Sequence, residues 1–101
     1  MGKPTGFLEY IRKDDTSRQS AERVRDWEEF HIALSEDSRR QQGARCMNCG
    51  VPYCQTGMIY EGKTFGCPLH NLIPEWNDMI MIGNRDHALA RLLKSNNFPE
   101  F

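Results

Sequence analysis

Four cysteines between residues 46 and 67 are the side chains of this sequence best suited to chemistry. They follow the pattern Cys46-x2-Cys49-x4-Cys54-x12-Cys67, and a proline comes directly after the last one. A C-x2-C turn directs two thiolates at one metal centre, and Gly50 after it is expected to take a positive φ that aims backbone N–H groups at sulfur. A Cys-Pro pair also closes bacterial cluster-binding motifs. The pattern therefore predicts a metal site in this loop.

Thiolates are soft ligands, so the realistic occupants are an iron–sulfur cluster and zinc. Three cysteines in a short C-x2-C-x4-C run favour a cubane cluster, because structural zinc sites usually use two separated pairs. Zinc held by the four cysteines, or by the first three with His70, is the alternative. A thioredoxin-like dithiol would need a βαβ setting that the sequence does not supply. The other histidines, His31 and His87, lie in helical patterns and are expected at or near the surface.

Length and charge limit the other classes of function. The chain has 101 residues with 13 Lys+Arg and 14 Asp+Glu, which fits one small domain with a modest core. Balanced charge without a long basic run argues against a nucleic-acid partner. No stretch approaches the roughly 18 apolar residues of a membrane span, and the N-terminus lacks the apolar run of a signal peptide. We therefore expect a cytoplasmic chain with no membrane partner, where clustered cysteines bind metal more often than they form disulfides.

The cysteine loop must be positioned by the elements on either side of it. Residues 1–17 are predicted to form an N-terminal arm in extended conformation, because glycines, a proline and an Asp-Asp-Thr-Ser turn signal interrupt them. Residues 18–101 are predicted to form a helical domain. Its first helix is expected from Ser20, and apolar residues at spacings of three and four would form its core-facing stripe: Val24, Trp27, Phe30 and Leu34.

Three further helices have recognisable ends. Ser35 is a candidate N-cap for a helix over 36–45, which leads directly to the first cysteine. Pro74 suits the first turn of the next helix, Gly83 suits its end, and Asn84 can cap the last helix. Trp76 is expected in the core. No alternating run of Val, Ile and Thr predicts a sheet. The expected fold is all-α, a small bundle of about four helices with a cysteine-rich loop.

No catalytic motif accompanies the cysteines. The sequence lacks a Gly-rich phosphate loop, a nucleophile elbow and a carboxylate pair at a spacing that suggests acid–base chemistry. We therefore assign no catalytic residue. The residues by themselves predict either an electron-relay module or a zinc-stapled helical module for protein interaction without a redox role.

Four segments of the chain resemble the N-terminus of the glutamate synthase small (beta) subunit. The resemblance runs through the whole chain and rests on MGKPTGFLEY (1–10), ARCMNCGVPYC (44–54), GCPLHNLIPEWND (66–78) and NNFPEF (96–101). Related N-terminal modules occur in dihydropyrimidine dehydrogenase and similar flavin oxidoreductases. The resemblance thus identifies the chain as an N-terminal iron–sulfur domain.

This resemblance implies an alpha-helical ferredoxin-like domain that holds two [4Fe–4S] clusters, followed in the same polypeptide by FAD- and NADPH-binding domains. Electrons would pass from NADPH to FAD and through the clusters to the large subunit, where glutamine and 2-oxoglutarate give glutamate. The implied partners are the large subunit and the C-terminal FAD/NADPH domains. The implied cofactors are the clusters in this segment, with FAD and NADPH in the other domains.

The same resemblance implies that Cys46, Cys49 and Cys54 serve one cluster and Cys67 the other. The family has a further Cys-Pro-x-Pro-Cys segment just beyond the position of Phe101, so we expect the chain to be a piece without its remaining ligands. Alone, this piece is expected to be free of clusters or to bind zinc through its thiols, and not to be catalytic.

Overall fold

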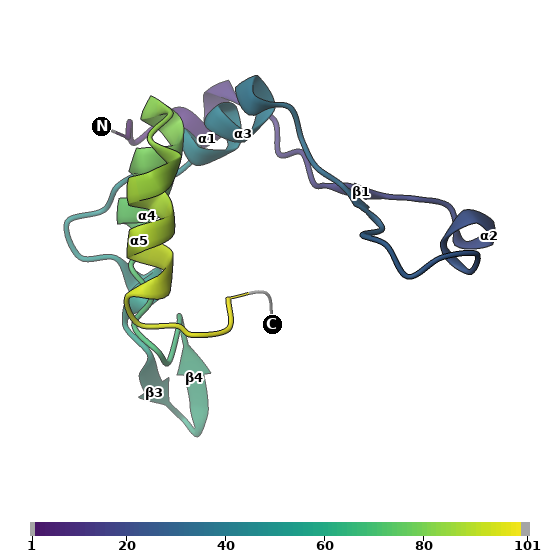
Figure 1. Cartoon of the computed structure of the whole chain (residues 1–101). Coiled ribbons are helices and arrows are strands. Elements are labelled where there is room, and N and C mark those ends of the chain that lie inside the picture. Colours follow the sequence, from purple (N-terminus) through teal and green to yellow (C-terminus); the bar gives the residue numbers. More distant parts are fainter. Residues whose placement is uncertain (1, 100–101) are drawn as a thin grey trace.

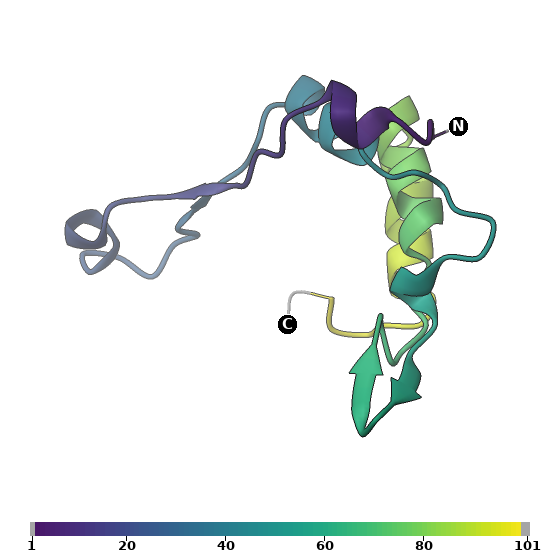
Figure 2. The ribbon, with the colours of Figure 1, turned by 180° about the vertical axis from the view of Figure 1, so that it is seen from behind.

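The computed structural model describes residues 2–99, so Met1 of the predicted arm and residues 100–101 of the C-terminal motif lie outside the described part. The regular elements are short (Figures 1 and 2). In chain order they are α1 (Gly6–Glu9), β1 (Thr16–Ser17), α2 (Ser20–Arg23), β2 (His31–Ile32), α3 (Glu36–Gly43), the 3₁₀ turn η1 (Tyr53–Gln55), β3 (Met58–Tyr60), β4 (Lys63–Phe65), α4 (Ile73–Ile82) and α5 (Arg85–Leu93).

Helices α3, α4 and α5 form the body of the molecule, and their ends follow the predicted signals. The Ser35 hydroxyl accepts a hydrogen bond from the Ser38 backbone N–H at 3.3 Å and caps α3. Pro74 lies in the first turn of α4, and Gly83 ends that helix in the left-handed region at φ 86°. The Asn84 side chain accepts from the His87 N–H at 3.2 Å and caps α5. These three predicted helices are confirmed.

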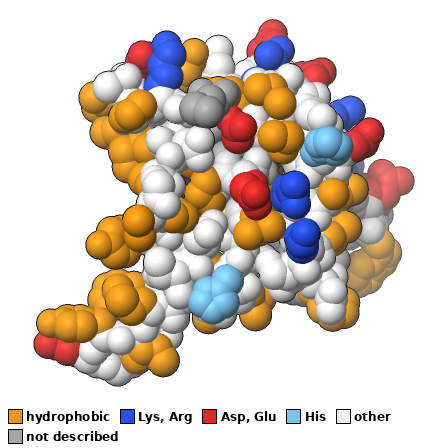
Figure 3. Space-filling model, turned by 90° about the vertical axis from the view of Figure 1, so that its left-hand side faces the viewer, with side chains coloured by type: hydrophobic (Ala, Val, Ile, Leu, Met, Phe, Trp, Pro, Cys, Tyr) orange, Lys and Arg blue, Asp and Glu red, His pale blue; other side chains and the backbone are white. Residues whose placement is uncertain are grey.

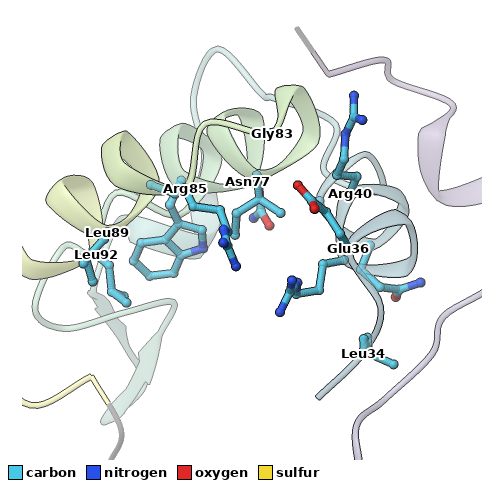
Figure 4. Close-up of a pocket in the computed structure, with 14 residues that line it drawn as sticks. Leu34, Glu36, Arg40, Asn77, Gly83, Arg85, Leu89 and Leu92 are labelled. Atoms are coloured by element: carbon cyan, nitrogen blue, oxygen red, sulfur yellow. The ribbon is translucent and has the colours of Figure 1, made fainter.

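The three helices pack through α4, which contacts both α3 and α5. At Gly43 the backbones of α3 and α4 come close, since a Cβ there would lie 2.8 Å from the Asn77 carbonyl oxygen. An apolar groove of about 550 Å³ runs between the three helices. Figure 4 shows Glu36 and Arg40 of α3 on one side of it and Leu89 and Leu92 of α5 on the other.

Residues 11–33 form a projection that extends away from the body (Figure 1). Strands β1 and β2 pair antiparallel along it, and α2 lies near its tip. The Arg18 guanidinium bonds both carboxylate oxygens of Asp26, at 2.8 and 3.2 Å, and closes the tip. The radius of gyration is 15.7 Å, larger than the roughly 13 Å typical of a compact chain of about 100 residues.

This projection contradicts the predicted helix over 20–34. Helix α2 ends at Arg23, and two apolar residues of the predicted core-facing stripe are largely exposed: Trp27 at 104% and Val24 at 83%. Leu34 of that stripe is half-buried and lines the groove between the helices, but it lies outside any helix. A helix of this length is stabilised mainly by packing its apolar face, and the projection offers no surface for that face. The backbone instead pairs in β1 and β2.

The predicted arm over 1–17 is only partly extended. Its residues 6–9 form α1, which lies against the end of α3: a Cβ on Gly6 would approach the Ala44 carbonyl oxygen to 2.1 Å. The Arg45 guanidinium donates to the carbonyl oxygens of Phe7, at 3.2 Å, and of Tyr10. Residues 2–10 are thus attached to the segment that leads into the cysteines.

Two other expectations are wrong in detail. Strands occur where none was predicted, as the two antiparallel pairs β1–β2 and β3–β4. The modest core is also missing from residues 2–99, where Pro74 and Ala88 are the buried apolar side chains and Trp76 is only half-buried. The all-α fold class stays a prediction, because two strand pairs and two single-turn helices accompany α3–α5. No described helix is long and apolar enough to cross a membrane.

Candidate metal centre

All four cysteines lie in residues 44–72, which we call the cysteine loop, between α3 and α4. Cys46 follows the last turn of α3, where its N–H donates to the Gly43 carbonyl at 3.2 Å. Cys54 lies within η1, and Cys67 follows β4. Cys46 and Cys67 are half-buried, Cys49 and Cys54 are exposed, and all four are free thiols.

The hairpin β3–β4 brings Cys54 and Cys67 together although they are 13 positions apart. The Cys67 N–H donates to the Cys54 carbonyl oxygen at 2.7 Å, which joins the two backbones. Gly66 permits this approach. Its φ is +75°, and a Cβ there would lie 2.2 Å from the Tyr53 carbonyl oxygen. Position 66, where the hairpin returns to the cysteines, therefore requires glycine, the residue without a Cβ.

The C-x2-C turn differs from its prediction in one respect. Gly50 is absent from the described residues with positive φ, whereas Asn48, between the two cysteines, has φ 50°. Asn is among the few residues that tolerate this region, because its short polar side chain bonds locally. The Asn48 N–H donates to the Cys46 sulfur at 3.4 Å. An N–H group does point at sulfur in this turn, but a residue other than Gly50 makes the left-handed bend.

Cys67 has the most developed polar environment of the four. The Asn71 amide nitrogen donates to its sulfur at 3.1 Å, and Asn71 is only 8% exposed. The Ser95 hydroxyl, just after α5, donates to the side-chain oxygen Oδ1 of Asn71 at 3.2 Å. The pKa of the Cys67 thiol is lowered, first by the Asn71 backbone N–H and also by N–H groups of Leu69 and His70, which stabilise the thiolate. Cys67 is thus prepared to act as a thiolate ligand.

Cys54 has the opposite environment. Its pKa is raised, first because neighbouring side chains desolvate the sulfur and then because the charge of Cys46 opposes a second thiolate. Cys49 and Cys67 act in the same direction. The Cys54 sulfur is therefore within electrostatic reach of the other three. A metal cation or cluster in their midst would remove this repulsion, because a coordinating thiol is deprotonated.

The cysteines do not form a finished metal site within residues 2–99. No three His, Cys, Asp or Glu side chains of this described part are grouped closely enough to hold a metal ion. This includes the predicted zinc alternative with His70, whose Nδ1 lies 3.0 Å from the Gln55 carbonyl oxygen. His31 and His87 are exposed, as expected. Four thiols with N–H donors at two sulfurs are nevertheless the donor set that an iron–sulfur cluster takes.

Two features of the site escaped the sequence analysis. Asn71 carried no signal as a cysteine partner, because only its burial and its bond to sulfur distinguish it from other asparagines. The second is an apolar hollow of about 540 Å³ beside Cys54, lined also by residues of β3–β4. The sequence predicts an irregular loop at its lining residues, because strands of only three residues show no alternating pattern.

Comparison with known proteins places these thiols in context. Residues 23–101 match the family described as dihydropyrimidine dehydrogenase domain II, 4Fe-4S cluster. The glutamate synthase [NADPH] small chain of Bacillus subtilis is 54% identical over the whole chain, which covers 20% of that relative. The small chain of Mycobacterium tuberculosis is 45% identical, with 19% of its length covered.

Glutamate synthase [NADH] of Schizosaccharomyces pombe is 42% identical over the whole chain, which covers 4% of that much longer polypeptide. The chain thus spans about a fifth of the length of the bacterial relatives it matches. The match covers all four cysteines, and it agrees with the donor set found in the cysteine loop. The chain therefore belongs to the 4Fe-4S cluster family of dihydropyrimidine dehydrogenase domain II and resembles the iron–sulfur domain of glutamate synthase small chains.

Proposed function

We propose that this chain is the cluster-binding, electron-transferring part of an NADPH-dependent glutamate synthase small chain. One observation carries the proposal: four free thiols share one loop in a chain that belongs to a 4Fe-4S family. The other three cysteines raise the pKa of Cys54 by their charge, in addition to the effect of desolvation. Clusters bound here supply one-electron carriage. The protein supplies the thiolates, the N–H groups directed at sulfur and the shape of the surrounding surface.

The proposed ligands are the four cysteines of the loop. As the family resemblance implies, Cys46, Cys49 and Cys54 serve one [4Fe–4S] cluster and Cys67 a second one. The described cysteines are not grouped closely enough to hold a metal ion by themselves. This agrees with clusters whose remaining ligands come from other parts of a longer polypeptide. Asn48 and Asn71 hold their N–H groups at the sulfurs of Cys46 and Cys67, where they stabilise the negative charge of a thiolate.

The rest of the proposed activity belongs to a whole glutamate synthase. FAD and NADPH would bind in other domains of the polypeptide and deliver electrons to this segment. The large subunit would receive them and form glutamate from glutamine and 2-oxoglutarate. A cytoplasmic location fits these substrates. Bacterial relatives are named for NADPH and the fission yeast relative for NADH, so the choice of nicotinamide is assigned to the domains outside this segment.

The test is metal analysis of the full-length polypeptide and of residues 1–101 alone, both prepared without oxygen. We expect a brown full-length protein with about eight iron and eight sulfide per chain, as two cubane clusters require, and a colourless or zinc-binding fragment. Cys49→Ala and Cys67→Ala should each remove about half of the iron. Met47→Ala is the matched control, because Met47 is an exposed neighbour of Cys46 without a ligand atom for the cluster. This variant should keep all of its iron.

Two results would overturn the proposal. Colourless full-length protein with bound zinc would make the loop a structural staple for protein interaction. Full iron content in both cysteine variants would show that the clusters bind elsewhere.

A further inference from the structure

Hairpin β3–β4 has two chemically different faces. Its register pairs Met58 with Phe65, Ile59 with Thr64 and Tyr60 with Lys63. Because side chains alternate along a strand, one face carries Met58, Tyr60, Phe65 and Lys63, and the other carries Ile59 and Thr64. The Tyr60 and Phe65 rings confirm this arrangement, with centroids 6.4 Å apart. Lys63 does not line the hollow beside Cys54, so the part of this face that borders the hollow is apolar and aromatic.

This apolar face points to a cysteine. The hollow of about 540 Å³ is lined by Tyr53, Cys54, Met58, Tyr60, Phe65 and Gly66, and none of these residues is charged. Met58 and Phe65 keep 49% and 47% of their surface exposed, because nothing among residues 2–99 fills the hollow. Figure 3 shows that hydrophobic side chains dominate the hairpin, the lowest part of the molecule in that view.

The base of the hairpin is fixed to the cysteine backbone. A Cβ on Gly57 would lie 2.9 Å from the Cys67 carbonyl oxygen, and a Cβ on Gly66 would lie 2.2 Å from the Tyr53 carbonyl oxygen. The two strands otherwise pack chiefly with each other. A two-stranded hairpin is marginally stable in water unless its apolar face is covered. The face thus needs an occupant, and the group closest to it is whatever Cys54 binds.

We propose that the apolar face of β3–β4 is the cover of the cluster held by Cys54 and that it sets how much water reaches that cluster. This inference rests on the proposed function. Addition of one electron makes a cluster and its thiolates more negative, and an apolar neighbour disfavours the added charge. Met58, Tyr60 and Phe65 are accordingly potential-setting residues: they lower the reduction potential of the cluster and slow attack by water-borne reagents.

The experiment compares the two faces of the hairpin in the full-length, cluster-loaded polypeptide. Met58→Ser and Tyr60→Ser each admit water on the covered face, whereas Ile59→Ser makes a comparable apolar-to-polar change on the opposite face of the same strand. Two quantities are measured: the reduction potential, by a titration followed with electron paramagnetic resonance, and the rate of iron loss to a chelator. Met58→Leu keeps the cover apolar and controls for shape.

We expect Met58→Ser and Tyr60→Ser to favour the reduced cluster about tenfold, which is about 59 mV for a one-electron couple. Iron loss should accelerate about tenfold, the lower end of the effect of substitutions around metal sites. Ile59→Ser and Met58→Leu should match the unaltered protein in both quantities. If Met58→Ser does not load a cluster, Tyr60→Ser and Ile59→Ser still provide the comparison of faces.

The outcomes separate this inference from the proposed function. A loaded cluster whose potential and iron loss respond equally to substitutions on both faces, or to neither, overturns the cover and leaves the electron-transfer role standing. An unchanged potential together with weaker binding to the large subunit would make the face a docking surface, which also overturns the cover. Absence of any cluster from the full-length polypeptide overturns both.

Discussion

Replacement of Gly66 by Ala tests how the hairpin holds Cys54 and Cys67 together. Gly66 has φ +75° and lies next to Cys67, whose N–H bonds the Cys54 carbonyl. Gly62, at the turn of the same hairpin, provides a matched control. Its φ is +74°, but a Cβ there would meet nothing within 4 Å, whereas a Cβ on Gly66 would lie 2.2 Å from the Tyr53 carbonyl oxygen. The two substitutions share backbone strain and differ in the collision.

The expected magnitudes follow from this difference. A left-handed Ala costs about 1–2 kcal/mol at either position. The collision at Gly66 lies more than an ångström inside ordinary contact distance and involves a backbone atom that no side-chain rotation can move away. Overpacking of this kind adds about 1–3 kcal/mol. Gly62→Ala should therefore cost about 1–2 kcal/mol, and Gly66→Ala about 2–5 kcal/mol.

Native-state hydrogen exchange of the Cys67 amide measures this cost locally, because the amide exchanges when its bond to Cys54 opens. In the full-length polypeptide, the Cys67 amide of Gly66→Ala should exchange about 5–150-fold faster than that of Gly62→Ala, the ratio that corresponds to 1–3 kcal/mol. Cluster content should fall in the Gly66 variant only. Exchange rates within twofold of each other would refute the argument, because the collision of the added Cβ at position 66 with the Tyr53 carbonyl would then add no measurable free-energy cost.

Three further predictions concern titration and hydrogen bonding. In metal-free protein near pH 8, iodoacetamide should modify Cys67 before Cys54, because the pKa of Cys67 is lowered and that of Cys54 is raised. This preference should shrink as the pH rises above both pKa values. Peptide mass spectrometry measures the two alkylation rates, and equal rates at pH 8 would contradict the assignment. Asn71→Ala should raise the pKa of Cys67 and slow its alkylation at pH 8, whereas an unchanged rate would show that the amide bond to sulfur does not stabilise the thiolate. Arg18→Gln should move the lowered pKa of Asp26 up towards its ordinary 3.8; an unmoved Asp26 titration by NMR would mean that the ion pair is not formed in solution.

The elements that sequence signals located correctly are those with local causes. Helices α3, α4 and α5 begin and end where Ser35, Pro74, Gly83 and Asn84 direct the backbone. A cap or a left-handed glycine acts within one turn, so its effect does not depend on the rest of the molecule. The location of the cysteine loop between two helices was predictable for the same reason.

The elements that were missed depend on packing between distant residues. The apolar period from Ser20 predicted a helix, but Trp27 has no surface to pack on, and the bond between Arg18 and Asp26 closes a different structure. Strands β3 and β4 are too short to show an alternating pattern. The role of Asn71 arises from contacts with Cys67 and with a residue 24 positions later, which no short window of sequence contains.

The hydrogen bonds from Ser95 to Asn71 and from Asn71 to Cys67 connect the end of α5 with a sulfur. Coupling of this kind is reciprocal in free energy. If a ligand on Cys67 stabilises the hydrogen bond from Asn71 by some factor, that hydrogen bond raises the affinity of Cys67 for the ligand by the same factor. Ser95 contributes to this affinity because it holds Asn71 in place. A partner that displaces the chain after α5 would thus weaken binding at Cys67 without contact to the sulfur, so occupancy of the site would report on the position of the segment that follows α5.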